Sequence, residues 1–570
     1  MAGIPLDGGL WLYGNQKLAD CILSFIDAEG KNFSFHLGGA APRQWQKLAL
    51  TIEELNVSLP IWLCEIQIFP QEQSGTFFID ELNLFELTLK QNGWVFLEGE
   101  PVNLQLSCQY SGSPHELNLH AQLVGNGIEK DSAKEITISE DNSFHLNFGY
   151  LPQGRYELLF SGQKEKLTFS LPPTAITILA SKTEGLATKP YFGLQTHYAL
   201  NRGRLPDNLQ LASLAGADFI RDEILWTDVE PQQNRFAFPQ KYDQFLAAAS
   251  EMGLKTLLIL DYGNPIYCQG APTTPLELSA WRRYVTNVVQ RYHGQVKHWE
   301  VWNEFNGGMG LTPEQRTWSV GEKAERYVAI LKESYQAIKK IDPQATVIGC
   351  VNAGIDLPFI EEVINKGGLS YMDAISIHPY CYPKSPEEAN LIAKIDEVNQ
   401  LIASSGGKQP LWITEIGWPT HDASWGISPQ QQANYLARLY TLLRVYGKVE
   451  AVFWYDLQND GPDSANAEHN FGIIDVDLSP KPAYLAYGTF ARALQGTIAT
   501  ETLNLAPAVQ CYRFQGQGKD NLVLWSTKSE TIVSLPQLPE RFSIRTTSGE
   551  LIPQSSIDIN NFQLGESPII

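Results

Sequence analysis

Two glutamates, Glu304 and Glu415, each end a short apolar segment, HWEVWNE in the first case and LWITE in the second. Two carboxyl groups held across a bound sugar have a specific chemistry. One protonates the leaving oxygen of a glycosidic bond, and the other attacks the anomeric carbon or activates water. This chemistry requires rigidly held side chains, and strand ends hold side chains better than loops do. The two glutamates lie far apart along the chain, so the fold has to bring them together.

Eight apolar segments alternate with amphipathic helical segments, a pattern typical of a parallel sheet wrapped by helices. The strands are expected at 191–197, 218–226, 255–264, 298–306, 346–354, 372–380, 411–418 and 451–460. Eight such units in about 300 residues predict a (β/α)8 TIM barrel with long loops. Each segment begins apolar and ends polar, and the carboxyl ends of barrel strands form the active site in this fold. Glu304 and Glu415 would then end strands four and seven and face each other across the mouth.

The remaining sequence reads as β-sandwich modules. Short alternating strands between Gly, Asn and Pro turns predict a sandwich at 1–90 and an immunoglobulin-like sandwich at 91–174. The barrel is placed at 186–492 and a small C-terminal sandwich at 495–570, with a linker expected at 171–190. The first module resembles jelly-roll carbohydrate-binding modules in its GLWLYG stretch, and its first strands would then precede Met1. A spacer without a ligand is the alternative.

Composition excludes several classes of partner. The net charge of −21 and the sequence pI near 5.0 would repel a polyphosphate backbone, so nucleic-acid binding is not expected. The seven cysteines are scattered, and no CxxC pair or Cys/His cluster predicts a metal site, while no motif predicts a cofactor. No apolar run of about 18 residues predicts a membrane span.

The compartment stays open at this point. The segment MAGIPLDGGLWLYGNQ lacks the basic and apolar regions of a signal peptide. The chain would be cytoplasmic if Met1 is the true start and exported if the N-terminus is incomplete. The oligomeric state is not readable from the sequence.

The strand motifs resemble those of a known family. HWEVWNEFN resembles the acid/base strand of clan A glycoside hydrolases, whose signature is Asn-Glu at the end of strand four, and LWITEIGWPT resembles their nucleophile strand. The segments 219–238, 257–267, 375–380 and 460–484 are similar to family 39, especially to bacterial exopolysaccharide-cleaving endoglycosidases. The resemblance covers about 190–490. One departure is Phe305, where the family has Pro after Asn-Glu, which is expected to put an aromatic ring at the rim.

The resemblance implies a retaining hydrolase that cleaves β-glycosidic bonds of a polysaccharide or oligosaccharide by double displacement. Glu415 would be the nucleophile and Glu304 the general acid/base. Arg221 matches the family's cation beside the nucleophile, and a structural ion pair with Asp222 or Glu223 is the alternative. Asn303 would bind the sugar 2-hydroxyl, or else cap the loop after strand four.

Further residues are assigned to the substrate site on the same resemblance. His378 and Tyr380 match positions near the nucleophile, and Tyr380 is expected to donate to Glu415. Trp454 matches the aromatic platform under the sugar, with packing in the barrel core as the alternative. Further lining residues are Trp226, Trp418 and His197, and Trp425 is a candidate for an outer subsite. Glu300 should point into the barrel and need a partner.

Two other functions remain open. One is a non-catalytic carbohydrate-binding protein on the same barrel, and the other is a transglycosylase in which an acceptor sugar replaces water. Both intact glutamates favour an enzyme over the first. The sugar, the linkage and the endo or exo mode are not encoded in these motifs.

Overall fold

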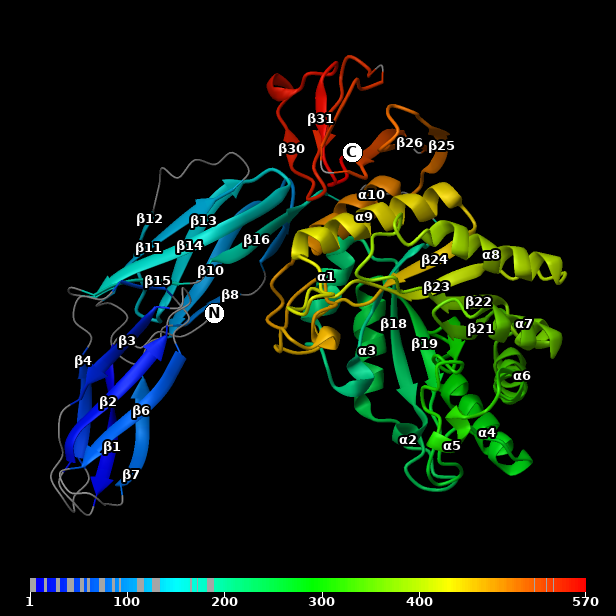
Figure 1. The fold of residues 1–570 in the computed structure, drawn as a ribbon. Helices are drawn as coiled ribbons and strands as arrows, with labels where there is room; N and C mark the ends of the chain where they lie inside the picture. The colour runs from blue at the N-terminus through cyan, green and yellow to red at the C-terminus, as the bar shows by residue number, and fades with distance from the viewer. Residues whose placement is uncertain are drawn as a thin grey trace. The chain divides into compact units, whose positions relative to one another are not determined.

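The structure is a computed structural model of the chain, and it divides into two compact units, Met1–Ile178 and Leu179–Ile570 (Figure 1). Each unit is described by itself. The structure describes residues 7–14, 18–26, 31–37, 46–51, 56–58, 62–70, 77–84, 88–91, 94–109, 117–125, 134–164, 167–171, 173–181, 189–516, 518–528, 530–536 and 538–570.

The first part of the N-terminal unit contains two three-stranded antiparallel sheets, β4-β1-β7 and β3-β2-β6. Their strands are β1 (Asp7–Gly14), β2 (Leu18–Ile26), β3 (Asn32–His36), β4 (Gln46–Thr51), β6 (Trp62–Pro70) and β7 (Phe77–Leu84). Cys21, Leu23 and Phe25 are buried and alternate with partly exposed neighbours, so one face of β2 packs inward. Parts of the predicted strands at 22–28, 32–38 and 74–86 lie outside the described residues. The jelly-roll assignment stays a prediction.

The second part of this unit has a three-stranded sheet, β13-β10-β8, and a larger sheet that contains β12-β11-β14-β15-β5 with β16 and β9. The strands are β5 (Asn56–Ser58), β8 (Thr88–Gln91), β9 (Val95–Leu97), β10 (Pro101–Gln109), β11 (Asn118–Val124), β12 (Lys134–Ile136), β13 (Ser143–Tyr150), β14 (Gly154–Lys164), β15 (Leu167–Ser170) and β16 (Thr174–Leu179). Alternate residues of these strands, among them Leu104, Leu119 and Leu158, form one buried cluster. The immunoglobulin-like assignment also stays a prediction.

The module edges differ from those drawn on the sequence. β5 pairs in parallel with β15, and β8 pairs with β10, so strands on both sides of the expected boundary at residue 90 join the second set of sheets. The predicted linker at 171–190 begins with a strand, because β16 pairs with β14 through residues 174–178. Residues 182–188 of that linker lie outside the described residues. The alternation of apolar and polar residues predicts strands but not which strands pair, so the sequence did not show these pairings.

The C-terminal unit is built on a closed barrel of parallel strands in the order β17 to β24, as predicted. The strands are β17 (Phe192–Gln195), β18 (Phe219–Leu225), β19 (Lys255–Asp261), β20 (His298–Val301), β21 (Thr346–Ala353), β22 (Ala374–His378), β23 (Leu411–Ile416) and β24 (Val449–Trp454). Seven of the predicted ranges contain one of these strands, and the eighth, 451–460, overlaps β24, which begins at Val449. The TIM barrel is therefore confirmed.

Helices surround these strands (Figure 1). They are α1 (Asp207–Ala215), α2 (Trp226–Val229), α3 (Gln240–Glu251), α4 (Pro275–Tyr292), α5 (Pro313–Arg316), α6 (Val320–Ile341), α7 (Leu357–Asn365), α8 (Leu391–Ser404), α9 (Pro429–Tyr446) and α10 (Pro482–Leu494). The three longest begin at capping boxes whose first residues are Thr274, Ser319 and Ser428, so the sequence itself marks their starts.

The barrel interior has an apolar lower layer, which we name the floor cluster. Its members are Phe219, Leu257, Ile348, Ala374, Trp412, Ala451 and Phe453. Glycine at position 193 leaves room for the Phe453 ring, because a Cβ at this position would lie only 2.3 Å from that ring and would clash with it. Alternate residues of a strand share a face, so Arg221 points inward like Phe219 but nearer the carboxyl end of β18. The strands thus carry an apolar floor and a polar mouth.

The chain ends in small antiparallel sheets, as predicted. Their strands are β25 (Ile498–Thr502), β26 (Val509–Gly516), β27 (Lys519–Ser526), β28 (Thr531–Val533), β29 (Ile544–Arg545), β30 (Leu551–Ile552) and β31 (Phe562–Leu564). Trp525 Nε1 donates to Glu387 of the barrel at 2.7 Å, and Arg438 Nε on α9 donates to the Glu566 carbonyl at 3.1 Å. Among the described residues, no helix is long and apolar enough to cross a membrane.

Candidate active site

Arg221 is the centre of a buried network at the mouth of the barrel. Nε and Nη2 donate to the two carboxylate oxygens of Glu300, both at 2.8 Å, and Nη1 donates to Glu415 Oε1 at 2.6 Å. The two remaining N–H groups donate to Gln195 Oε1 at 2.7 Å and Asn303 Oδ1 at 3.0 Å. All five donors of a fully buried guanidinium are thus used. The alternative pairing with Asp222 or Glu223 is not formed.

Glu415 ends β23 as a nearly buried carboxylate, with 7% of the residue exposed. Oε1 accepts from Arg221, Oε2 accepts from the Tyr380 hydroxyl at 2.8 Å, and His378 Nδ1 lies 3.5 Å from Oε2. Burial by itself raises the pKa of Glu415. The charges of His378 and Arg221 and the hydrogen bonds from Tyr380 and Arg221 outweigh burial, so the pKa lies below its usual value. This carboxylate is therefore held in its charged form.

Glu304 follows β20 and has a different environment. The strand ends at Val301, earlier than predicted, because the backbone turns: Trp302 and Glu304 have φ angles of 64° and 47°. Positive φ is uncommon outside glycine and recurs at functional sites. The Glu304 side chain is 21% exposed, against 9% for Glu415. One oxygen of Glu304, one oxygen of Glu415 and one ring nitrogen of His378 all lie within 4.8 Å of one another.

His378, fully buried at the end of β22, connects Glu304 to Glu300. Its Nδ1 lies 2.9 Å from Glu304 Oε1, and its Nε2 lies 2.9 Å from Thr414 Oγ1. The Thr414 hydroxyl donates to Glu300 at 3.1 Å, so its oxygen is free to accept from His378 Nε2–H. The Nδ1 contact joins His378 to Glu304. Glu304 is therefore hydrogen-bonded to an imidazole, whereas Glu415 is hydrogen-bonded to a guanidinium.

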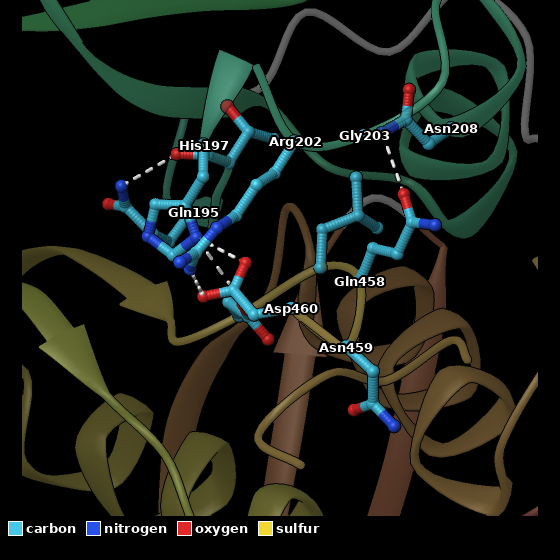
Figure 2. Close-up of a pocket in the computed structure, with 11 residues that line it drawn as sticks. Gln195, His197, Arg202, Gly203, Asn208, Gln458, Asn459 and Asp460 are labelled. Atoms are coloured by element: carbon cyan, nitrogen blue, oxygen red, sulfur yellow. Dashed lines mark hydrogen bonds and ion pairs between the residues drawn. The ribbon is translucent and has the colours of Figure 1, made fainter. Parts of the chain in front are cut away.

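A cavity adjoins this network where β17 and β24 end (Figure 2). His197 Nδ1 lies 2.9 Å from Asp460 Oδ1, and Arg202 also pairs with Asp460. Burial by itself lowers the pKa of His197, but the hydrogen bond that His197 donates to Asp460 and the charges of Asp460 and Asp456 raise it to about 9. Gln195 lines the cavity, and its Oε1 accepts a hydrogen bond from Arg221, so the cavity adjoins the Arg221 network.

The three tryptophans expected to line the sugar site are all completely buried. Trp418 stacks on Trp454 at 5.7 Å between ring centroids, and its Nε1 donates to the Lys384 carbonyl at 2.8 Å. Trp226 stacks between Tyr267 and Tyr284. None presents a face to a sugar, so Trp226, Trp418 and Trp454 are withdrawn as substrate contacts. Trp454 therefore packs in the core, which was the alternative considered for it.

Phe305 is also buried rather than placed at the rim. Its ring packs 5.6 Å from Trp302 and 5.4 Å from Tyr327, measured between ring centroids. The aromatic residue in place of the family's proline therefore anchors the turn after β20 to α6. It leaves the space above Glu304 to other residues.

Tyr455 is a site residue that the sequence did not single out. The ring lies 5.5 Å from His197, 6.1 Å from Tyr380 and 5.2 Å from Phe471, and its hydroxyl donates to Glu468 at 3.3 Å. Unlike Trp454 beside it, Tyr455 is only partly buried. A partly exposed aromatic ring thus lies between the His197 cavity and Tyr380. The signal that could have found it is its position immediately after β24.

Two more carboxyl groups lie on the inward faces of β18 and β19. The pKa of Glu223 is raised to about 7, by burial first and then by Asp222. Asp261 is fully buried, and neither of its side-chain oxygens has a hydrogen-bond partner among the described residues. Burial and then Glu223 raise its pKa well above the usual value. Both groups add proton-binding capacity beside Arg221, and neither was proposed from the sequence.

Paired carboxyl groups at the ends of the fourth and seventh strands of a (β/α)8 barrel define the class of clan A glycoside hydrolases. Residues 279–475 match the family model described as "Glycosyl hydrolase catalytic core". The chain therefore contains a glycosyl hydrolase catalytic core, as the motifs of strands four and seven had indicated.

Two curated relatives are similar to parts of the chain. A "Beta-xylosidase" of Caldicellulosiruptor saccharolyticus is 24% identical over 308 residues, which is 49% of this chain and 58% of the relative. An "Intracellular exo-alpha-(1->5)-L-arabinofuranosidase" of Acetivibrio thermocellus is 26% identical over 196 residues, which is 32% of this chain and 35% of the relative. The chain thus matches about a third to somewhat over half of the length of these proteins.

Among solved structures, a family 39 glycoside hydrolase from Bacteroides cellulosilyticus WH2 is similar to this fold, with a TM-score of 0.69 and 24% identity. The match covers 85% of this chain and 99% of that chain. At this identity the likeness establishes the fold, and it agrees with the family 39 resemblance of the barrel motifs. The types of the N-terminal modules are not established by it.

Proposed function

We propose that the barrel hydrolyses β-glycosidic bonds of an oligosaccharide or polysaccharide with retention of configuration. The observation that carries this proposal is the distance within 4.8 Å between oxygens of Glu304 and Glu415, together with their different partners. Retaining pairs lie about 5–5.5 Å apart, whereas inverting pairs lie about 6.5–9.5 Å apart to admit a water molecule. The short separation supports direct attack by one carboxylate.

The first step forms a covalent glycosyl-enzyme. Glu415 attacks the anomeric carbon, because the hydrogen bonds from Arg221 and Tyr380 keep the Glu415 carboxylate charged and fix its orientation. The bond between that carbon and the leaving oxygen breaks, and Glu304 supplies the proton that this oxygen takes. His378 is hydrogen-bonded to Glu304 and keeps the carboxyl group of Glu304 in position for this proton transfer.

The second step releases the sugar. Glu304, now charged, takes a proton from water, and the water oxygen attacks the anomeric carbon while its bond to Glu415 breaks. Asn303 is fixed at both ends of its amide, because Oδ1 accepts from Arg221 and Nδ2 donates to the Tyr262 hydroxyl at 3.3 Å. This fixed amide supports its proposed contact with the sugar 2-hydroxyl. His197, Tyr380 and Arg221 complete the proposed glycone site.

The names of the relatives favour a pentose as the glycone. One relative is a β-xylosidase and the other an exo-acting arabinofuranosidase. An aryl β-xyloside is therefore the first substrate to test, followed by a panel of aryl glycosides, oligosaccharides and polysaccharides. Glu415→Ala is the control for contaminating activity.

Two measurements test the mechanism. NMR of the first-formed product should show the same anomer as the substrate, and a slow 2-fluoro glycosyl fluoride should label the peptide that contains Glu415. An inverted product, or a label on another residue, would overturn the proposal. Glu304→Gln that behaves like wild type on every substrate would instead favour the non-catalytic carbohydrate-binding alternative. A product extended by an added acceptor sugar would assign transglycosylation to the same pair.

A further inference from the structure

The rim of the barrel carries an exposed tryptophan that the proposed chemistry has not used. Trp425 lies in the loop after β23 and is 40% exposed. Of the tryptophans whose side chains the structure describes, only Trp425 is exposed. Trp226, Trp418 and Trp454, which were expected to contact sugar, are buried. A single exposed hydrophobic side chain is normal on a protein surface, so a binding site is inferred here from how the residues around this indole are arranged.

The indole is held in place before any ligand arrives. Its ring stacks on Tyr382, from the loop after β22, with centroids 5.5 Å apart and planes 23° apart. The His421 ring packs against it edge-on at 3.9 Å, and His421 itself is buried. The backbone turn is closed by a bond from Gly426 N to the Ala423 carbonyl at 2.8 Å. Little side-chain freedom would be lost when a ligand contacts this surface.

Aromatic rings connect this surface to the catalytic pair. Tyr382 lies 5.8 Å from Tyr380, whose hydroxyl donates to Glu415. The pKa of Tyr382 is raised by burial first and then by the charges of Glu468 and Glu304, so its ring is within electrostatic reach of the acid/base. A path of rings thus runs from the exposed indole to the point where the glycosidic bond would break.

The order of the barrel strands separates two sides of the mouth. The His197 cavity lies at β17 and β24, whereas Glu304 follows β20 and is hydrogen-bonded to His378 on β22, the strand that the Tyr382 loop follows. The general acid protonates the leaving oxygen, so the sugar that departs lies on the side of the acid. The cavity side is then left for the sugar that becomes attached to Glu415.

We propose that Trp425 and Tyr382 form a binding surface for the sugar on the leaving-group side of the scissile bond. This inference rests on the proposed glycosidase function and adds a substrate class to it: a chain with at least one further pyranose ring beyond the bond that is cleaved. The flat indole packs against the C–H face of that ring, as aromatic faces do with apolar surfaces. A substrate whose leaving group is too small to reach the indole would not contact this binding surface.

The test compares two substrates that share the glycone. One is an oligosaccharide that the wild-type enzyme cleaves, and the other is the corresponding glycosyl fluoride, whose leaving fluoride ion is too small to touch the surface. In Trp425→Ala, the ratio of kcat/KM for the oligosaccharide to kcat/KM for the fluoride should fall about tenfold or more, from the loss of one aromatic contact. Trp425→Phe should recover most of the ratio.

Ile266 provides a matched control, because it is also 40% exposed and lies in a rim loop, after β19. Ile266→Ala should leave the ratio unchanged. An unchanged ratio in Trp425→Ala, with an unaltered melting temperature, would reject the binding surface and leave the glycosidase proposal standing. A wild-type enzyme that cleaves no oligosaccharide and no glycosyl fluoride in the substrate panel would instead reject the glycosidase function itself.

Discussion

The two ends of the eight barrel strands differ in chemistry, because one end is packed with apolar rings and the other holds buried charged groups. At the floor, Phe219, Trp412 and Phe453 pack ring to ring, with centroids 5.5–6.2 Å apart. At the mouth, Arg221 and Glu415 are buried charged groups that are hydrogen-bonded to each other. Apolar packing is non-directional and tolerates rearrangement, whereas a buried charge is stable only in one geometry. The floor should therefore govern stability, and the mouth should govern chemistry.

The largest effect is expected from the proposed nucleophile. Glu415→Ala should lower kcat/KM by about four orders of magnitude or more, because no other described carboxylate lies opposite Glu304 at bonding range. The fold should survive, since Arg221 keeps its two bonds to Glu300. Steady-state kinetics beside a thermal melt provide the measurement. A variant that loses activity only because it unfolds would break the division between floor and mouth.

A substitution in the floor cluster should have the opposite signature. Trp412→Ala removes a large buried ring and should cost about 3–5 kcal/mol of unfolding free energy. Below the melting temperature, kcat/KM should stay close to wild type, because Trp412 contacts no residue of the catalytic network in the described rings and hydrogen bonds. Chemical denaturation with parallel assays checks both quantities. A large fall in kcat/KM of the folded variant would show that the two layers are coupled.

A smaller effect is expected from a single hydrogen bond at the mouth. Tyr380→Phe removes the bond to Glu415 Oε2, and a hydrogen bond to a charged group contributes about 1.5–3 kcal/mol. That bond lowers the pKa of Glu415, so its loss should raise this pKa. The nucleophile must be charged, so the acid limb of the kcat/KM profile should move to higher pH. An unmoved acid limb would assign it to another group.

The sequence predicted what periodicity and strand position encode. Eight apolar segments ending in polar residues were enough to place Glu304, Glu415 and Arg221 at one mouth. It failed where the chain leaves the regular strand. The alternation of side chains does not extend past Trp454, so the expected sugar platform Trp454 is buried, and the partly exposed ring is that of Tyr455, which the sequence did not single out.

Burial was the other quantity that the sequence could not supply. Trp226 and Trp418 follow strand ends, like true site residues, yet helix and loop packing covers them completely. Asp261 shows the reverse problem, because an acidic residue at a strand end reads as a solvent-facing site residue but is fully buried. Whether a side chain at the mouth is open depends on contacts between distant loops, which single-sequence patterns do not contain.

The smallest effect expected concerns the His197 cavity and stability rather than chemistry. The pKa of His197 rises from 6.5 to about 9 on folding, because the hydrogen bond that it donates to Asp460 and the charges of Asp460 and Asp456 outweigh burial. A raised pKa stabilises the fold fully below pH 6.5, and this contribution is lost as pH rises through about 9. His197→Asn cannot titrate, so wild type should lose on the order of 1–3 kcal/mol relative to the variant across that window.

Another buried group titrates nearby and has the opposite sign. The pKa of Lys481 falls from 10.5 to about 8, mainly through burial, so its effect is to raise stability as pH increases between those values. Only the difference between wild type and His197→Asn isolates the histidine, because Lys481 is common to both proteins. Urea unfolding at pH 6 and pH 9 gives that difference. A difference that is flat with pH would mean that His197 is neutral in the fold, and the mouth would then hold less positive charge than the distances to Asp460 and Asp456 imply.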